Sequence, residues 1–577
     1  MLLTRNAKQT SGHHLMSNGK LDLNKSLLQS CDEGASYASG HGRSFEVRGS
    51  YSTLEFVVRL RRDVHQTLEA HGNTLDFVEA RSWDAIQAFS TYLHETIHWW
   101  QHCGTTAGLM LSFLQPAHAH LNRKLFDELL RRFGAVKPLR VLAENLLDSD
   151  KQDGTLNAVL NNWHDLEFFR KLASDPSRLV EGVSRDPYFH SVGHSYQMAI
   201  GATSWLIAAT LDPNYELLPH PKDWEPAMKS LRNECKLGFY RGSPIEVPML
   251  GLTQIFEGQA RFAQLQYLYC GSNRKLTWDD VRRLGMLEGI YVQAFNCFLE
   301  LVGKKWPEAI DDPLVPLFLL ICDLSLSPTE GLFLPMTDPS SLIWSTDPGW
   351  RFVFICGIAK DNGGDFLYSI RDCSADEYWR VSEILCAALL SPSPRVLAET
   401  IVNWADTHEN WIALAAEGRT FDFQPGNYPI RVLLSRFIQF QRDKLVSPHF
   451  FCWPGMCMTT DQKVIDPANA LRLFNEHEAL FLNKPEDFDV FPRLVKGVDE
   501  AKLQVLVDDF YAWVSVYDLT RQWLVEEGEF QYDFDWLTSK FSNDEVKRWV
   551  DENFKLSTGF YPDGFEIISR QEFDRPN

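Results

Sequence analysis

The chain has no hydrophobic run long enough to cross a membrane, and its longest apolar stretches have the length of buried core segments. Leu314–Ile321 is typical of them, whereas a transmembrane helix needs about 20 apolar residues. Residues 1–14 contain no apolar segment of the kind that secretory signals carry. The 11 cysteines are scattered along 577 residues, which is typical of reduced thiols. We therefore expect a cytoplasmic protein with no membrane partner.

Basic charge and nucleotide-binding motifs are also scarce. The 56 lysines and arginines are outnumbered by 77 aspartates and glutamates, which gives a net charge of −21. Nucleic-acid phosphates require a basic protein surface, so we expect no nucleic-acid partner. Neither G-x-G-x-x-G nor G-x-x-x-x-G-K-[ST] occurs in the chain. The sequence therefore does not support nucleotide binding.

Helical periodicity dominates the chain, and its apolar content is sufficient for large buried cores. Hydrophobic residues make up 45% of the sequence and aromatic residues 13%. Only short stretches at 45–48, 54–60 and 352–357 are rich in strand-forming residues. We therefore expect a mainly α protein with a small β element (α+β). The predicted helices cover residues 82–104, 105–114, 123–133, 138–147, 157–173, 196–211, 248–269, 277–302, 314–326, 375–390, 398–417, 431–442, 468–474 and 502–526.

Composition separates the chain into three regions, because its length exceeds that of one ordinary domain. Residues 1–42 are rich in serine, asparagine, glycine and lysine, and we predict a flexible N-terminal tail there. Four prolines in the segment 327–349 indicate a boundary. We therefore predict a catalytic domain at 43–330 and a mostly helical C-terminal domain at 331–577.

The most informative motif is H-E-x-x-H, formed by His94, Glu95 and His98. Residues four apart lie one turn above each other on a helix, so both histidines can bind one tetrahedral Zn²⁺ at about 2.0–2.1 Å. Glu95 lies about 100° round the helix from His94, which suits it to deprotonate a water on the metal. Ser82 is a favourable N-cap and Gly104 is placed to end the helix. The motif therefore lies on a capped helix.

A zinc hydrolase needs a third protein ligand. The metzincin pattern would place glycine at position 101 and histidine at position 104, where this chain has Gln101 and Gly104. His102 lies about 12 Å along the helix axis from His94. We expect His102 to support the ligands, to face the substrate or to be solvated. The third ligand is therefore expected on another helix.

A glutamate from a later helix is the best candidate for the third ligand. Glu-Gly pairs recur in the chain, but Glu257 lies on a narrow polar stripe of a largely apolar helix. A charged residue on such a stripe is rarely buried without a partner, and a zinc ion would provide one. Gly258 and Ala260 would let this helix approach a neighbour such as the metal helix closely. Glu288 and Glu181 are the reserve candidates.

The pattern H-E-x-x-H-x-x-Q at His94, followed by Glu-Gly-x-Ala-Arg at Glu257, resembles the zincin metallopeptidases of the gluzincin, or peptidase MA-like, type. The resemblance implies a zincin-like core, a Zn²⁺ cofactor and hydrolysis of peptide or protein substrates. His94, His98 and Glu257 would match the metal ligands, and Glu95 the general base. Zincins commonly add an oxyanion donor. The candidates for that donor are His190, His194, Tyr196 and Arg261.

Other interpretations remain open. The chain could be a helical scaffold or binding protein with an inert or structural metal site. A di-iron site would need a second E-x-x-H, and none occurs. His190 and His194 could form a second metal pair or be ordinary core or surface histidines. His449, Cys452 and Cys457 lack the fourth ligand and the spacing of a structural zinc site. The oligomeric state is left open.

Overall fold

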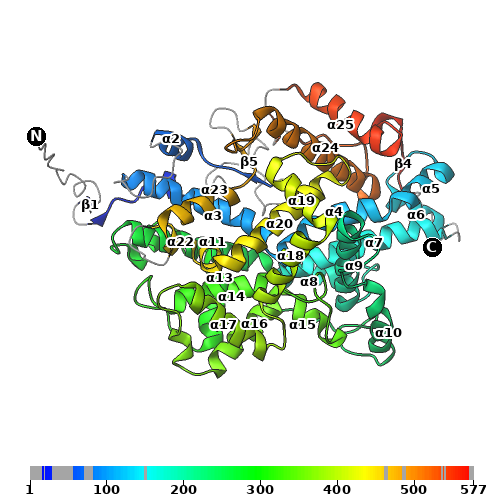
Figure 1. Ribbon diagram of the computed structural model, residues 1–577. Coiled ribbons are helices and arrows are strands. Elements are labelled where there is room, and N and C mark those ends of the chain that lie inside the picture. Colours follow the sequence, from blue (N-terminus) through cyan, green and yellow to red (C-terminus); the bar gives the residue numbers. More distant parts are fainter. Residues whose placement is uncertain are drawn as a thin grey trace, which may run out of the picture.

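The computed structural model describes residues 16–17, 20–28, 56–70, 82–148, 152–459, 465–483, 489–534, 537–538 and 541–570. Figure 1 shows their arrangement. The strand predicted at 45–48 lies outside the described residues, as does most of the predicted tail at 1–42.

Helices account for 68% of the chain and strands for 3%, which confirms the predicted mainly α class with a small β element. Two of the three small sheets join segments far apart in sequence: β3 runs parallel to β5, and β4 runs parallel to β7. β5 also pairs with β6, and β1 with β2, both antiparallel. The strands are β1 (Met16–Ser17), β2 (Lys20–Leu21), β3 (Val57–Val58), β4 (Val136–Lys137), β5 (Phe481–Asn483), β6 (Val490–Pro492) and β7 (Glu566–Ile567).

The helices run from the N-terminal segment almost to the C-terminus, and none within the described residues is long and apolar enough to span a bilayer. Those before residue 330 are α1 (Lys25–Leu28), α2 (Arg62–Ala70), α3 (Trp83–Gly104), α4 (Thr106–Leu121), α5 (Arg123–Phe133), α6 (Leu139–Asp148), α7 (Gly154–Ser174), α8 (Pro176–Ser184), α9 (Val192–Leu211), α10 (Glu225–Asn233), α11 (Leu252–Gly271), α12 (Trp278–Arg283), α13 (Ile290–Val302) and α14 (Leu314–Leu326).

The later helices are α15 (Leu342–Thr346), α16 (Pro348–Asp361), α17 (Ala375–Ala388), α18 (Pro394–Thr407), α19 (Glu409–Thr420), α20 (Tyr428–Val446), α21 (Pro448–Cys452), α22 (Pro454–Cys457), α23 (Pro467–His477), α24 (Glu500–Val525) and α25 (Asn543–Thr558). Single turns of 3-10 helix are η3 (Pro221–Trp224), η4 (Pro339–Ser341), η5 (Phe366–Tyr368) and η6 (Pro562–Gly564).

Helix α3, which carries the H-E-x-x-H motif, begins and ends where the sequence predicts. The hydroxyl of Ser82 accepts a backbone hydrogen bond of 3.2 Å from the first turn, and the helix ends at Gly104. Thr105 then caps α4, because its hydroxyl accepts a hydrogen bond of 3.1 Å from the N–H of Gly108. A Cβ atom on Gly108 would lie 2.0 Å from the carbonyl oxygen of Gln101. The close α3–α4 turn therefore depends on this glycine.

Helices α3 and α11 form the centre of the packing around the motif. They lie against each other, as Figure 1 shows, and α1, α2, α4 and α20 also contact α3. Helices α13, α14 and α22 cover α11, which is buried along most of its length. The facing surfaces of α3 and α11 are therefore screened from solvent by other helices.

Part of the segment predicted as a tail is packed against α3. The hydroxyl of Thr91 donates a hydrogen bond of 2.7 Å to the carbonyl oxygen of Leu27, which is buried. The backbone N–H of Asn24 donates one of 2.6 Å to the side chain of Gln87. The prediction of a flexible tail is therefore wrong for residues 20–28, because their backbone groups bond polar side chains of the helix.

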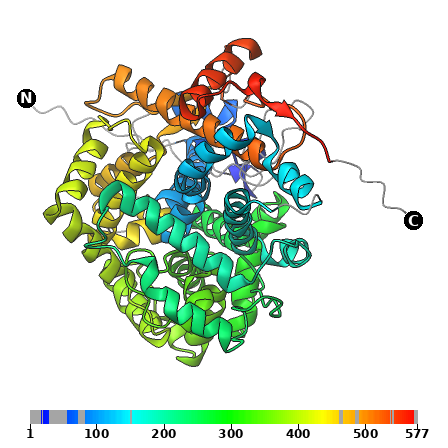
Figure 2. The same ribbon diagram turned by 90° about the vertical axis from the view of Figure 1, so that its right-hand side faces the viewer.

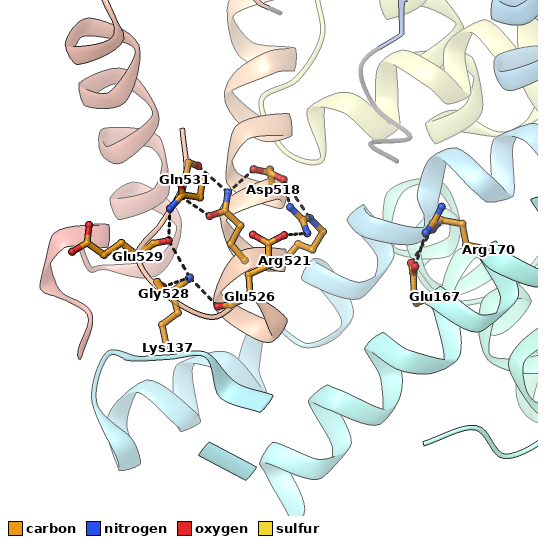
Figure 3. Close-up of polar contacts among 10 residues, drawn as sticks. Lys137, Glu167, Arg170, Asp518, Arg521, Glu526, Gly528, Glu529 and Gln531 are labelled. Atoms are coloured by element: carbon orange, nitrogen blue, oxygen red, sulfur yellow. Dashed lines mark hydrogen bonds and ion pairs between the residues drawn. The ribbon is translucent and has the colours of Figure 1, made fainter. Parts of the chain in front are cut away.

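The C-terminal helices pack onto the N-terminal half of the chain. α24 contacts α4, α6 and α20, and Figure 2 shows α24 and α25 in orange and red beside blue and cyan helices. The buried ammonium of Lys137 donates to the carbonyl oxygens of Glu526 at 2.9 Å and Gly528 at 2.6 Å (Figure 3). Buried apolar residues on both sides of residue 330 belong to one core. The division into domains at 43–330 and 331–577 remains a prediction.

The strand predicted at 352–357 is wrong, because these residues lie in α16. The side chain of Asp347 accepts a hydrogen bond of 2.8 Å from the N–H of Trp350, and Pro348 occupies the first helical position. The buried side chains of the segment recur with helical spacing. A short apolar run does not separate a strand from a buried helix by itself.

Several further boundaries differ from the predictions, and the helix predicted at 398–417 is divided into α18 and α19. α4 continues through Pro116, because burial of this helix outweighs the roughly 3 kcal/mol cost of an interior proline. The loop predicted at 212–229 contains the start of α10. The helix predicted at 277–302 is divided into α12 and α13, and Gly285 and Gly289 between them have positive φ angles.

Candidate metal centre

Three side chains from α3 and α11 converge in one cluster, which we call the metal centre: His94, His98 and Glu257. Nε2 of His94 is 3.2 Å from Nε2 of His98. The carboxylate of Glu257 is 3.6 Å from Nε2 of His94 and 3.5 Å from Nε2 of His98. The three side chains are 4%, 13% and 13% exposed, respectively. The fold thus brings together the three residues predicted as ligands, although 159 residues separate His98 from Glu257 (257 − 98 = 159).

The donor set and its spacing fit a zinc ion. Tetrahedral ligands at about 2.0–2.1 Å from one ion lie about 3.4 Å from one another. The two Nε2 atoms are 3.2 Å apart, and each lies 3.5–3.6 Å from a different oxygen of Glu257. Two imidazole nitrogens and one carboxylate are a common catalytic zinc set. Oε2 of Glu257 is buried and has no hydrogen-bond partner among the described residues. A cation at this position would satisfy that oxygen.

Close packing of α3 and α11 depends on a small residue other than those predicted. A Cβ atom on Gly271 would lie 2.7 Å from the side chain of Ile86 on α3, so this glycine lets the helices approach. Gly258 instead faces Ala294 on α13 and Phe318 on α14. Gly258 thus allows the predicted close approach of a neighbour, but that neighbour is α13 and not the metal helix.

Burial and mutual charge set the protonation of the metal centre. Burial lowers the pKa of His94 to about 4. Burial also acts to lower the pKa of His98, but the charge and hydrogen bond of Glu257, the charge of Glu95 and the hydrogen bond with Gln101 together raise this pKa to about 9. Burial would raise the pKa of Glu257, yet the two histidines hold it well below its usual value. The pKa shifts thus favour a positively charged His98 beside a negatively charged Glu257, and a metal ion would compete with the proton of His98.

Glu95 and Tyr291 flank the metal centre. Glu95 is partly buried, and its charge contributes to the raised pKa of His98. The ring centroids of Tyr291, on α13, and His94 are 6.2 Å apart. The guanidinium of Arg261 lies over the face of the Tyr291 ring at 4.0 Å. A partly exposed phenol thus stands beside the predicted ligands.

The four candidates for the oxyanion donor lie at different places relative to the metal centre. Arg261 is 1% exposed, packs on Tyr291, and its positive charge helps to lower the pKa of His94. His194 bonds Asp165 on α7 at 3.1 Å, and the rings of His190 and His194 lie 4.7 Å apart. No contact found among the described residues joins these two histidines to the metal centre.

The hydroxyl of Tyr196 donates a hydrogen bond to Asp347, the residue that caps α16. Tyr291, which was not among the four candidates, lies beside His94 instead. It comes two residues after the Glu-Gly pair at Glu288, and that pair is the one signal in the sequence that pointed to this segment.

The reserve ligands and His102 lie in other surroundings. Glu288 is exposed, and Glu181 is exposed and paired with Arg185. His102 is buried, and burial lowers its pKa to about 3. Its ring packs 5.2 Å from the ring of Phe256, the residue before Glu257. The interpretation of His102 as solvated is therefore wrong, and it supports the site from within the core.

A second group of three ligand-type residues adjoins α3, and we call it the second cluster: Asp443, Glu476 and His477. Nε2 of His477 bonds Asp443 at 2.8 Å, and the indole of Trp100 on α3 donates to the carbonyl oxygen of His477 at 2.7 Å. These two groups are the clusters with metal-ligand spacing among the described residues. The segment around His449 is not one of them.

Comparison with known proteins adds no relative. No family model, no curated protein and no solved structure matches this chain. The chemistry of the metal centre is therefore argued from its own atoms.

Proposed function

We propose that the protein is a cytoplasmic zinc-dependent peptide-bond hydrolase with a zincin-like core, whose metal ligands are His94, His98 and Glu257. The observation that carries the proposal is the convergence of two imidazoles and one carboxylate: the two Nε2 atoms lie 3.2 Å apart, and Oε2 and Oε1 of Glu257 lie 3.6 Å from His94 and 3.5 Å from His98, respectively. These groups supply three of the four positions of a tetrahedral zinc site, which leaves the fourth for water or substrate. Bound zinc polarises a carbonyl group and acidifies a coordinated water to a pKa of about 7.

Glu95 supplies the general base in this proposal. It follows His94 directly, and its side chain lies close enough to His98 for its charge to raise that pKa. A carboxylate there accepts the proton of the attacking water and transfers it to the nitrogen of the leaving amine. Such proton transfer is worth roughly 10²–10⁴-fold in rate.

Tyr291 supplies the donor for the developing oxyanion. The side chain is partly exposed, so a substrate carbonyl at the metal centre can approach it. Arg261, held by Gln264 at 2.7 Å, lies over a face of the ring at 4.0 Å and helps to keep it in place. A preorganised donor of this kind lowers the barrier because it needs no rearrangement during the reaction.

The test is the variant Glu95→Gln, assayed with a fluorescently labelled casein and with zinc content measured on the same sample. We expect hydrolysis to fall by roughly 10²–10⁴-fold while zinc content stays at about one ion per chain, because Glu95 is not a ligand. The matched control is Glu288→Gln, the same change at an exposed glutamate, which should alter neither quantity.

Unchanged hydrolysis in Glu95→Gln would rule out the proposed general base. A wild-type protein that binds zinc but cleaves no peptide would instead support the alternative, a helical scaffold or binding protein with a structural or inert metal site.

A further inference from the structure

Gln101 connects the two ligand-bearing helices through its side-chain amide. It lies one turn after His98 on α3 and is buried. Its Nε2 donates hydrogen bonds of 2.9 Å to the carbonyl oxygen of Phe256 and to Oε1 of Gln259, both on α11. Its Oε1 lies 2.8 Å from Nδ1 of His98. One amide therefore bonds a predicted ligand on α3 and the backbone beside the predicted ligand on α11.

The direction of these bonds follows from the chemistry of their partners. A backbone carbonyl oxygen only accepts hydrogen bonds, so the amide nitrogen of Gln101 must face Phe256. The amide oxygen must then face His98, and an amide oxygen also only accepts. Nδ1 of His98 consequently carries a hydrogen. Its other nitrogen, Nε2, is the atom that faces His94 and Glu257.

We propose that Gln101 is a positioning residue, which holds His98 with Nε2 toward the metal and sets the distance between the ligand pair on α3 and Glu257. The inference rests on the proposed function only for metal binding and is independent of peptide hydrolysis. Groups that orient a metal-bound histidine through its second nitrogen typically contribute 10- to 100-fold to metal affinity. The same contribution is expected of Gln101.

The experiment compares zinc dissociation constants, measured by competition with a chromophoric chelator, for the full-length wild type and three variants. Gln101→Leu removes all three hydrogen bonds at similar volume, and we expect affinity to fall roughly 10- to 100-fold. Gln101→Glu keeps an acceptor for Nδ1 of His98 but no donor for α11, so its affinity should lie between those of the wild type and the leucine variant. Gln266→Leu is the matched control, a buried glutamine of α11 whose Oε1 has no hydrogen-bond partner among the described residues.

A second measurement requires no variant and applies even if Gln101→Leu does not fold. In wild-type protein loaded with ¹¹³Cd and labelled with ¹⁵N, we expect cadmium coupling to Nε2 of His98 and a slowly exchanging hydrogen on Nδ1. Coupling to Nδ1, or wild-type zinc affinity in a folded Gln101→Leu, would overturn the proposal. A wild type that binds no metal would instead refute the proposed zinc site itself.

Discussion

The metal centre and the second cluster offer similar ligand atoms beside the same helix but differ in what neutralises their charge. In the second cluster Arg472 forms ion pairs with Glu476 and, at 3.6 Å, with Asp443. Gln439 also donates to Asp443 at 2.7 Å. In the metal centre the carboxylate of Glu257 pairs, among the described residues, only with the two imidazoles. The carboxylates of the second cluster are therefore ion-paired with an arginine, whereas no arginine or lysine is found paired with Glu257 among the described residues.

This difference separates a structural cluster from a binding site. A buried carboxylate is stable when a permanent positive charge and hydrogen bonds satisfy it, as in the second cluster. A protonated imidazole is a less permanent counter-charge for a buried carboxylate, because a metal ion can replace the proton that neutralises Glu257. Three nearby ligand-type residues are thus insufficient evidence of a metal site, and the neighbouring side chains decide between the two outcomes.

The strongest test of the comparison is one substitution made in both clusters. Glu257→Ala should lower zinc affinity by more than the roughly 10- to 100-fold typical of residues outside the ligand set, because it removes a ligand. Glu476→Ala should leave zinc affinity unchanged. Isothermal titration calorimetry with zinc measures both. Equal losses in the two variants, or no loss in Glu257→Ala, would contradict the assignment of the metal centre.

The free energy of unfolding should depend more on the second cluster than on the metal centre. In zinc-free protein, His477→Ala should lower the free energy of unfolding by about 1–3 kcal/mol, because it leaves the carboxylate of Asp443 without its 2.8 Å partner. His94→Ala should cost less, because Nδ1 of His94 already has no hydrogen-bond partner among the described residues. Urea unfolding in the presence of a chelator compares the two variants. A larger loss for His94→Ala would show that the metal centre also holds the fold together.

The smallest effect is expected from Arg472→Ala. The arginine side chain is 47% exposed, so its ion pairs should contribute at most about 1 kcal/mol to stability. Its removal should nevertheless expose the second cluster to cations, and a second, weaker zinc equivalent should appear in the calorimetric titration. A stoichiometry that stays at one would mean that the guanidinium is not what keeps zinc from the second cluster.

Local chemistry was sufficient to predict α3 and its two histidines. Ser82 caps the helix, and the four-residue spacing of His94 and His98 places both side chains on one face wherever the helix packs. The same local reasoning failed for 352–357, because the period of a short apolar run is ambiguous. It also failed for residues 20–28, where bonds to Thr91 and Gln87 come from a distant part of the chain.

The rest of the metal centre is a product of packing between helices. Glu257 could be ranked first from its polar stripe, but its distance to the histidines depends on how α3 and α11 approach each other. The roles of Tyr291 and Gln101 could not be predicted from the sequence, because their contacts join different helices whose relative positions the sequence does not show. A helix has one spacing that holds for every sequence, whereas the arrangement of helices depends on how all their side chains fit together. The pair of histidines therefore follows from the sequence, and the third ligand from the tertiary fold.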